Sequence, residues 1–249
     1  MPAHLDRAID LNADLGEESP GEADILRFVT SANVACGAHA GGEAAMRRSV
    51  RLALACGVAV GAHPGFADRE GFGRRELPVT AGEAYELVAS QVRLLQRVAR
   101  EENASVVHVK PHGALYNMAA RDLDLARAIA RAVADAGIPI LYGLAGSELT
   151  RAAHQAGLRA MGEAFADRGY AAGGALVPRG ESGALLAPEQ ATKQALGLAL
   201  RGEVRAVTGE RVEIEAKTLC LHGDGGDAAR LARDLRGALE AAGVTVRAP

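Results

Sequence analysis

The amino-acid sequence predicts an α/β fold, an irregular seven-stranded parallel (β/α) barrel surrounded by helices. Three observations predict it: short apolar segments alternate with amphipathic helical segments, glycine-rich turns connect them, and polar residues follow one face of several predicted strands. The length of 249 residues fits one domain, 1–249, because barrels of this class typically run to about 250 residues. An open doubly wound sheet is the alternative for the same order of elements.

Seven segments have the composition of short buried strands, with aliphatic runs that end in glycine-containing turns. They cover residues 8–13, 31–36, 58–62, 106–110, 138–142, 158–164 and 218–221. Amphipathic helical patterns follow most of them, at residues 43–56, 80–100, 123–136, 147–156, 188–201 and 227–242. The helix at 80–100 has the clearest start, since Thr80 and Glu83 form a capping-box pattern.

One segment, residues 170–217, breaks this alternation and is predicted to be an insertion between the sixth and seventh strands. It begins with a loop rich in glycine and proline and continues with the helix at 188–201. It ends with a hairpin, residues 204–207 and 212–215, around Thr208 and Gly209. Loops of this length are often functional lids, and a mobile surface loop is the alternative interpretation.

Composition and charge exclude several classes of protein. The formal net charge is −3 with both signs interspersed, and the sequence has no basic run that would bind nucleic acid or a membrane surface. No stretch approaches about 18 uninterrupted apolar residues, and the N-terminus has no apolar signal core. The three cysteines form no CxxC pair, so we expect a reduced cytoplasmic protein.

Polar side chains alternate with aliphatic ones along four predicted strands. Because side chains in a strand point to alternate faces, residues two apart share a face. An antiparallel sheet with one wet face would show the same alternation, but the intervening helices disfavour it. In a barrel the aliphatic face meets the helices, so the pattern predicts a polar interior funnel. The in-phase polar residues are Asp10, Asn12 and Asp14; His108, Lys110 and His112; Glu163 and Asp167; and Cys220, His222 and Asp224.

Histidines concentrate at the carboxyl ends of the predicted strands. A single histidine is more often a satisfied core residue, but active sites of such barrels lie where the strands end. We therefore interpret this group as functional. Five of the seven histidines lie in or directly after strands, namely His39, His63, His108, His112 and His222.

Arginines stand beside two of the predicted loops. Arg74 and Arg75 follow the third strand, and Arg168 and Arg179 flank the start of the insertion. They could clamp a phosphate or carboxylate, or be solvated or pair with nearby acids, and both interpretations stay open.

This set of side chains supports metal binding or general acid–base chemistry. Zinc would prefer the histidines, and Lys110 is expected to pair with an acid or to meet an anion. No HExxH, GxSxG, GxGxxG or GxxxxGK[ST] motif occurs, so no local pattern identifies a metal, a serine nucleophile or a nucleotide site. A hard cation such as Mg²⁺ would prefer the carboxylates of Asp14, Glu17, Glu163, Asp167 or Asp224.

Nine motifs in order resemble the LamB/YcsF family, whose members are the A subunits of bacterial ATP-hydrolysing 5-oxoprolinase. The resemblance runs from about residue 8 to residue 243. It implies a glycoside hydrolase/deacetylase-like barrel, ATP as co-substrate, and 5-oxoprolinase subunits B and C as partners. The implied reaction converts 5-oxo-L-proline, ATP and two waters into L-glutamate, ADP and phosphate. The motifs are DLNADLGE (10–17), SANVACGAHAG (31–41), GAHPGF (61–66), FGRR (72–75), VKPHGALYN (109–117), GLAGSE (143–148), EAFADRGY (163–170), LVPR (176–179) and CLHGD (220–224).

The resemblance and the chemistry together suggest roles for the polar residues. The predicted catalytic residues are Asp14, Glu17, Lys110, His112 and Asp224. The predicted substrate-binding residues are Asn12, His39, His63, Arg74, Glu163 and His222. Asp14, His63 and Asp224 are candidate metal ligands, with Mg²⁺ the expected cation.

Two alternative functions remain at this stage. One is a stand-alone metal-dependent amidase or deacetylase on the same fold. The other is a non-catalytic subunit that binds the lactam for its partners.

Overall fold

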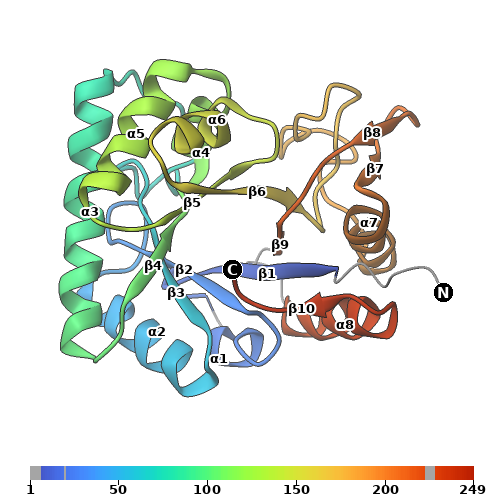
Figure 1. Cartoon of the computed structure of the whole chain (residues 1–249), viewed down its shortest axis with the longest axis horizontal. Helices are drawn as coiled ribbons and strands as arrows, with labels where there is room; N and C mark the ends of the chain where they lie inside the picture. Colours follow the sequence, from blue (N-terminus) through green and yellow to red (C-terminus); the bar gives the residue numbers. More distant parts are fainter. Residues whose placement is uncertain (1–6, 20, 222–227) are drawn as a thin grey trace.

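The computed structural model describes residues 7–19, 21–221 and 228–249, and its centre is a closed ring of parallel strands (Figure 1). Strand β1 pairs with both β2 and β9, and this double pairing closes the ring. The seven-stranded barrel is therefore confirmed, and the open doubly wound sheet is excluded. The seven strands are β1 (Ala8–Leu15), β2 (Ser31–Ala35), β3 (Ala59–His63), β4 (Val106–Val109), β5 (Ile140–Leu144), β6 (Arg159–Phe165) and β9 (Thr218–Leu221).

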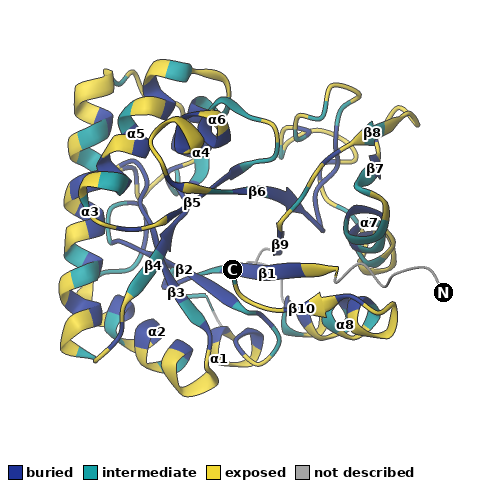
Figure 2. Cartoon of the chain, in the orientation of Figure 1, coloured by how far each residue is buried: buried dark blue, intermediate teal, exposed yellow. Residues whose placement is uncertain are grey.

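Helices surround the ring and turn their buried sides toward it, while their outer sides are exposed (Figure 2). Six of them fall where the apolar periodicity predicts them. In α3 the capping box is present, because Thr80 N donates to Glu83 Oε2 at 2.8 Å and the Thr80 hydroxyl accepts from Glu83 N. The six are α2 (Glu43–Cys56), α3 (Ala81–Glu101), α5 (Leu123–Asp135), α6 (Glu148–Gln155), α7 (Pro188–Arg201) and α8 (Ala228–Ala241).

Three short elements do not follow from the sequence pattern. They are α1 (Glu22–Ile25), α4 (Gly113–Arg121) and β10 (Thr245–Val246). Strand β10 pairs in parallel with the first residues of β1, outside the ring. An element of two to four residues is too short to show a period, and α4 starts inside a glycine-containing turn that resembles a loop.

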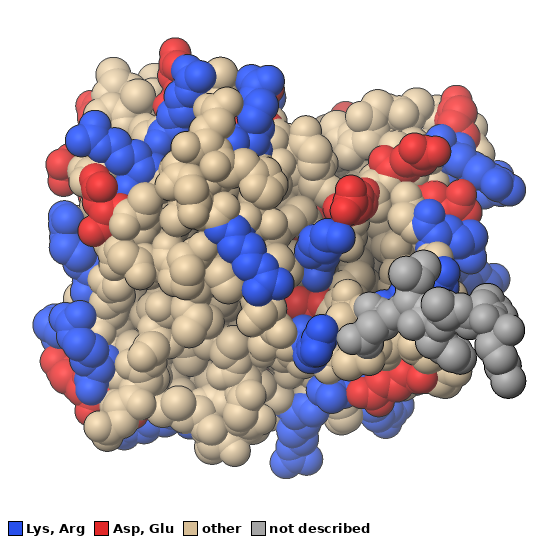
Figure 3. All heavy atoms as spheres, in the orientation of Figure 1, with Lys and Arg blue, Asp and Glu red and all other residues tan. Residues whose placement is uncertain are grey.

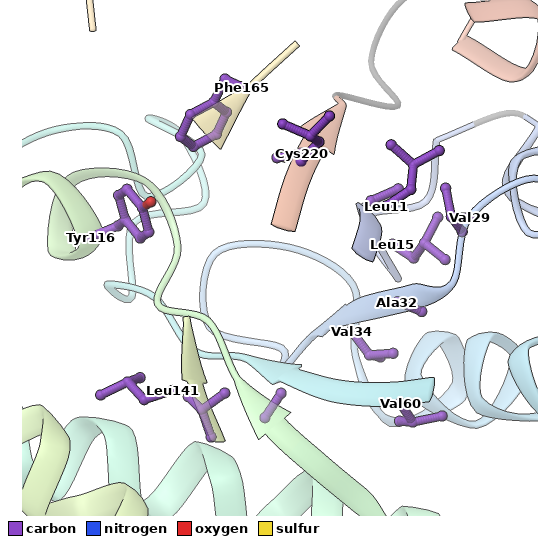
Figure 4. Close-up of a cluster of buried hydrophobic side chains, with 14 of the residues drawn as sticks. Leu11, Leu15, Val29, Ala32, Val34, Val60, Tyr116, Leu141, Phe165 and Cys220 are labelled. Carbon is purple, nitrogen blue, oxygen red and sulfur yellow. The ribbon is translucent and has the colours of Figure 1, made fainter. Parts of the chain in front are cut away.

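An aliphatic layer fills the space between the ring and the helices. Leu11 and Leu15 of β1 are buried, together with Val34 of β2 and Val60 of β3 (Figure 4). They belong to the same apolar cluster as Met46 of α2. Burying each Leu or Val side chain contributes roughly 1.5–3 kcal/mol, so this layer provides most of the stabilisation.

The barrel interior is polar, and at its amino end it is closed by one carboxylate. Asp10 is 1% exposed and accepts hydrogen bonds from four hydroxyl groups. These come from Thr30 at 2.7 Å, Ser31 at 2.7 Å, Tyr142 at 2.9 Å and Thr218 at 2.6 Å. Four donors satisfy a charge that would otherwise be costly to bury, so Asp10 has a structural role.

The segment between β6 and β9 leaves the ring and returns to it. Its first part folds back on itself through isolated bridges that pair Arg168 with Leu185 and Tyr170 with Leu176. Helix α7 follows, and then β7 (Glu203–Arg205) and β8 (Arg211–Glu213) form an antiparallel hairpin. Among the helices that the structure describes, none is both long and apolar enough to cross a bilayer.

Candidate active site

A cavity of about 540 Å³ opens at the carboxyl ends of the strands. Asp14 and Glu17 reach it from the end of β1, His63 from the end of β3, and Lys110 and His112 from the turn after β4. The insertion forms part of the wall through residues 175–179. The strand ends and the insertion therefore line one site that contains charged and imidazole groups, at the end of the barrel where such enzymes have their active sites.

Lys110 lies at the base of this cavity and is paired with two carboxylates. Its ammonium group lies 2.9 Å from Glu163 Oε1 and 3.0 Å from Asp14 Oδ1, and it also donates to Asn12 Oδ1 at 3.2 Å. Burial alone would lower the pKa of Lys110, but the charges of Asp14 and Glu163 outweigh it and raise that pKa well above its ordinary value. The amine is thus held as a cation.

A chain of hydrogen-bonded amide side chains fixes the carboxylates of Asp14 and Glu163. Asn12 Nδ2 donates to Glu163 Oε1 at 3.0 Å, and Asn33 Nδ2 donates to Asn12 Oδ1 at 2.8 Å and to Asp14 Oδ1 at 2.9 Å. The chain ends at His108, whose Nε2 lies 2.8 Å from Asn33 Oδ1. Burial lowers the pKa of His108 to about 3, so the ring is neutral and Nε2–H donates. These residues position the site without lining the cavity.

Three histidines and one carboxylate form a second group at the cavity edge. His63 Nε2 lies 2.9 Å from His112 Nδ1, and the ring of His39 stacks on that of His112 with centroids 3.8 Å apart. Glu17 Oε1 lies 3.4 Å from His39 Nε2 and 3.5 Å from His112 Nδ1. Burial is the main reason that the pKa values of His39 and His112 fall below their ordinary value. Among the described residues, these four form a group that can hold a metal ion.

Glycines make room for the histidines. A Cβ on Gly65 would lie 2.8 Å from His39 Nδ1, and a Cβ on Gly73 would lie 2.9 Å from His39 Cβ. Gly73 also has a φ of 63°, and Phe72 before it has a φ of 54°. This left-handed turn directs the Phe72 carbonyl oxygen to His112 Nε2 at 2.7 Å.

Arginines line the outer part of the cavity. Of the pair after β3, Arg74 lines the cavity, whereas Arg75 forms an ion pair with the buried carboxylate of Asp68. Arg168 and Arg179 line the side formed by the insertion. On the face shown in Figure 3, basic and acidic side chains are interspersed, and the described residues there form no continuous basic patch.

The family model for the LamB/YcsF family matches residues 9–249. The chain belongs to the LamB/YcsF family. It is 50% identical over 249 residues to the A subunit of 5-oxoprolinase from Geobacillus kaustophilus (strain HTA426), a match that covers 98% of this chain and 97% of the relative.

Two solved structures place this LamB/YcsF protein in structural context. The lactam utilization protein from Thermus thermophilus is 45% identical with a TM-score of 0.89, and the match covers 97% of this chain and 100% of the other. The peptidoglycan deacetylase PdaC from Bacillus subtilis has a TM-score of 0.51 at 11% identity, covering 98% and 88% of the two chains. The second likeness shows only a shared fold, the expected deacetylase-like barrel.

The predicted site residues of the LamB/YcsF protein fall into three sets. Six line the cavity: Asp14, Glu17, His63, Arg74, Lys110 and His112. Asn12, His39 and Glu163 are buried against that set. The predicted catalytic residue Asp224 and the predicted substrate-binding residue His222 lie outside the described residues.

Sequence reasoning missed several residues that shape the LamB/YcsF site. Asn33 joins Asn12 to Asp14, although the alternation of Ser31 and Asn33 along β2 could have revealed it. Tyr116 and Phe165 also line the cavity. Burial, followed by the charge of Glu163, raises the pKa of Tyr116 well above its ordinary value, so its hydroxyl keeps its proton.

Proposed function

We propose that this chain is the A subunit of an ATP-dependent 5-oxoprolinase, which opens 5-oxo-L-proline to L-glutamate with ATP hydrolysis. The observation that carries the proposal is the 50% identity, across almost the whole of both chains, to a relative named as the A subunit of 5-oxoprolinase. The cavity supports it, because cationic, acidic and imidazole groups surround one space large enough for a small lactam.

The chemistry of ring opening explains why such a mixture of groups is needed. Water must add to the lactam carbonyl carbon, the C–N bond must break, and the ring nitrogen must gain a proton. An unactivated lactam is a poor electrophile, so transfer of the γ-phosphoryl group of ATP to its oxygen, with ADP as the leaving group, would activate the carbonyl carbon. Addition of one water and cleavage of the C–N bond would then leave an acyl phosphate, which the second water would hydrolyse to the carboxylate of L-glutamate and phosphate. Charge then develops on oxygen in the transition state, where fixed cations act most strongly.

We assign the residues to these steps by position. Lys110 and Arg74 hold the lactam oxygen or its phosphate, and Asp14 accepts a proton from the attacking water. Asp14 then passes this proton to the leaving nitrogen, and Glu17 and His112 orient the substrate beside it. His39, His63, Asn12 and Glu163 orient these groups.

ATP and the partner subunits belong to the same proposal. Neither a GxGxxG nor a GxxxxGK[ST] motif occurs in the sequence, so we assign ATP, with Mg²⁺, to the complex with subunits B and C rather than to a motif of this chain. We also propose a cytoplasmic location, since Cys36, Cys56 and Cys220 are all free thiols.

Reconstitution tests this function. The chain is co-expressed with its two partner subunits, and glutamate is measured from 5-oxoproline with and without ATP. We expect glutamate only when all three subunits and ATP are present. Equal glutamate formation without this chain would overturn the proposal, and so would ATP-independent amide hydrolysis by this chain alone.

A further inference from the structure

The hydrogen bonds of two histidines determine where their protons lie. His63 Nδ1 lies 2.7 Å from the carbonyl oxygen of Lys110, and His112 Nε2 lies 2.7 Å from that of Phe72. A carbonyl oxygen only accepts, so each of these ring nitrogens carries the proton and donates. In the neutral rings His63 Nε2 and His112 Nδ1 therefore both carry lone pairs, yet they face each other at 2.9 Å.

A buried carboxylate oxygen lies beside these two lone pairs. Glu17 Oε1 has no hydrogen-bond partner among the described residues, and it lies 3.5 Å from His112 Nδ1. Three electron-rich atoms thus converge without a donor between them. One proton could bridge only two of these atoms, whereas a divalent cation would satisfy all three.

We infer that Glu17, His63 and His112 form a binding site for a divalent transition metal of the zinc class. Two imidazole nitrogens and one carboxylate oxygen are a set that zinc accepts. This set shares His63 with the metal ligands predicted from the sequence and adds Glu17 and His112. The predicted ligand Asp14 lies beside it, with Oδ2 3.3 Å from His63 Nε2, and Asp224 lies outside the described residues.

The measured separations fit such a coordination sphere. With metal–ligand bonds of about 2.0–2.1 Å, ligand atoms at angles of roughly 90° to 115° lie about 2.9 to 3.5 Å apart. The two separations measured for His112 Nδ1 are 2.9 Å to His63 and 3.5 Å to Glu17. The rings of His63 and His112 are perpendicular, which lets both direct their lone pairs to one point.

His39 has a different role in this site. Its ring is parallel to that of His112 within 2°, and a metal ion lies close to the plane of each imidazole that binds it. Two stacked rings cannot both satisfy that condition for one ion. His39 Nε2 instead lies 3.4 Å from Glu17 Oε1, so the His39 ring packs beside the carboxylate ligand and restricts its position.

The three ligands all line the cavity, whereas His39 does not. A bound cation would therefore keep an open coordination position toward the substrate space, the arrangement of catalytic zinc sites. The metal site stands on its own geometry, and only its use in lactam hydrolysis rests on the proposed function.

Metal titration of the purified full-length chain tests the site. After removal of metal with EDTA, Zn²⁺ is added in a calorimeter and Co²⁺ is followed by its visible absorption. We expect one ion per chain and Co²⁺ bands of low-symmetry coordination. Glu17→Gln and His39→Ala should each weaken binding by about 10- to 100-fold or more, and His63→Ala and His112→Ala should abolish it.

The control is His154→Ala, which changes an exposed histidine at the end of α6 and should bind as the wild type does. Circular dichroism in EDTA identifies the variants that fold. If a histidine variant does not fold, Glu17→Gln, which keeps the side-chain shape, still tests the site. Absence of binding by the folded wild-type chain overturns the site, as does unchanged binding by folded Glu17→Gln and His112→Ala. Metal binding without glutamate formation in the complex would overturn only the proposed function.

Discussion

The ammonium group of Lys110 lies 2.9 Å from a carboxylate oxygen of Glu163, and both side chains are buried. Glu163 comes from β6 and Lys110 from the turn after β4, so the pair connects two segments on either side of β5 in the ring. A buried ion pair contributes little net stability, but it makes each partner necessary to the other.

Replacing Lys110 should therefore destabilise the protein as well as inactivate it. Lys110→Met leaves the charges of Asp14 and Glu163 without their cation, and we expect a loss of about 3–5 kcal/mol in the free energy of unfolding. Urea unfolding measures it. The double variant Lys110→Met, Glu163→Gln should recover part of the lost free energy of unfolding. A loss below about 1 kcal/mol in Lys110→Met alone would contradict the ion-pair interpretation.

Asp10 should matter for stability and not for catalysis. Asp10→Ala removes the acceptor of four buried hydroxyl groups, and we expect a loss of about 2–5 kcal/mol, measured by urea unfolding. At a temperature where the variant stays folded, kcat of the reconstituted complex should stay within about twofold of the wild type. A large fall in kcat with unchanged stability would show that Asp10 belongs to the active site.

His108 should contribute to the loss of stability in acid. Burial lowers its pKa from 6.5 to about 3, so between these values the unfolded chain binds a proton that the folded chain does not. The free energy of unfolding then falls with decreasing pH across this window, by up to about 1.4 kcal/mol per pH unit for this group. In His108→Gln this dependence should be shallower between pH 4 and 6, and identical slopes for the two proteins would count against a neutral buried His108.

Arg168 should hold the insertion against the cavity. Its guanidinium donates to the carbonyl oxygens of Ala184 at 3.0 Å and Val177 at 2.7 Å, and the second of these residues lines the cavity. We expect Arg168→Ala to cost about 1.5–3 kcal/mol of stability and to raise KM for the lactam more than it lowers kcat. Arg233→Ala, an exposed position on α8, is the matched control. Steady-state kinetics of the complexes reconstituted with each variant measures both constants. An unchanged KM in Arg168→Ala would show that Arg168 does not hold the insertion against the cavity.

The period of the sequence predicted the fold and the face of the polar residues that the structure describes on β1 and β4. Alternation along β1 correctly placed Asp10, Asn12 and Asp14 on the inner face of the barrel, where Asp10 and Asn12 are buried and Asp14 lines the cavity. The alternation did not distinguish the roles of these three residues. Their side chains point to the same face of β1, but they lie at different depths along the barrel. Asp10 closes the amino end, while Asp14 reaches the cavity.

Contacts between distant segments could not be read from the sequence. The proton position on His112 depends on a carbonyl oxygen of Phe72, which is directed there by a left-handed turn forty residues earlier. His108 shares a face with Lys110 and His112, yet it is stacked on Tyr142 below the cavity, with ring centroids 4.4 Å apart. The spacing in the sequence therefore does not distinguish His112, which lines the cavity, from His108, which does not.

The most direct test of the account is the rate of glutamate formation by the reconstituted complex with Asp14→Asn. This change removes the carboxylate of Asp14 but keeps the side-chain shape, and Lys110 retains Glu163 as its partner. We predict a loss of at least about 100-fold in kcat, with full activity in the control Asp124→Asn at an exposed position of α5. An Asp14→Asn complex that forms glutamate at the wild-type rate would contradict the claim that ring opening takes place in this cavity.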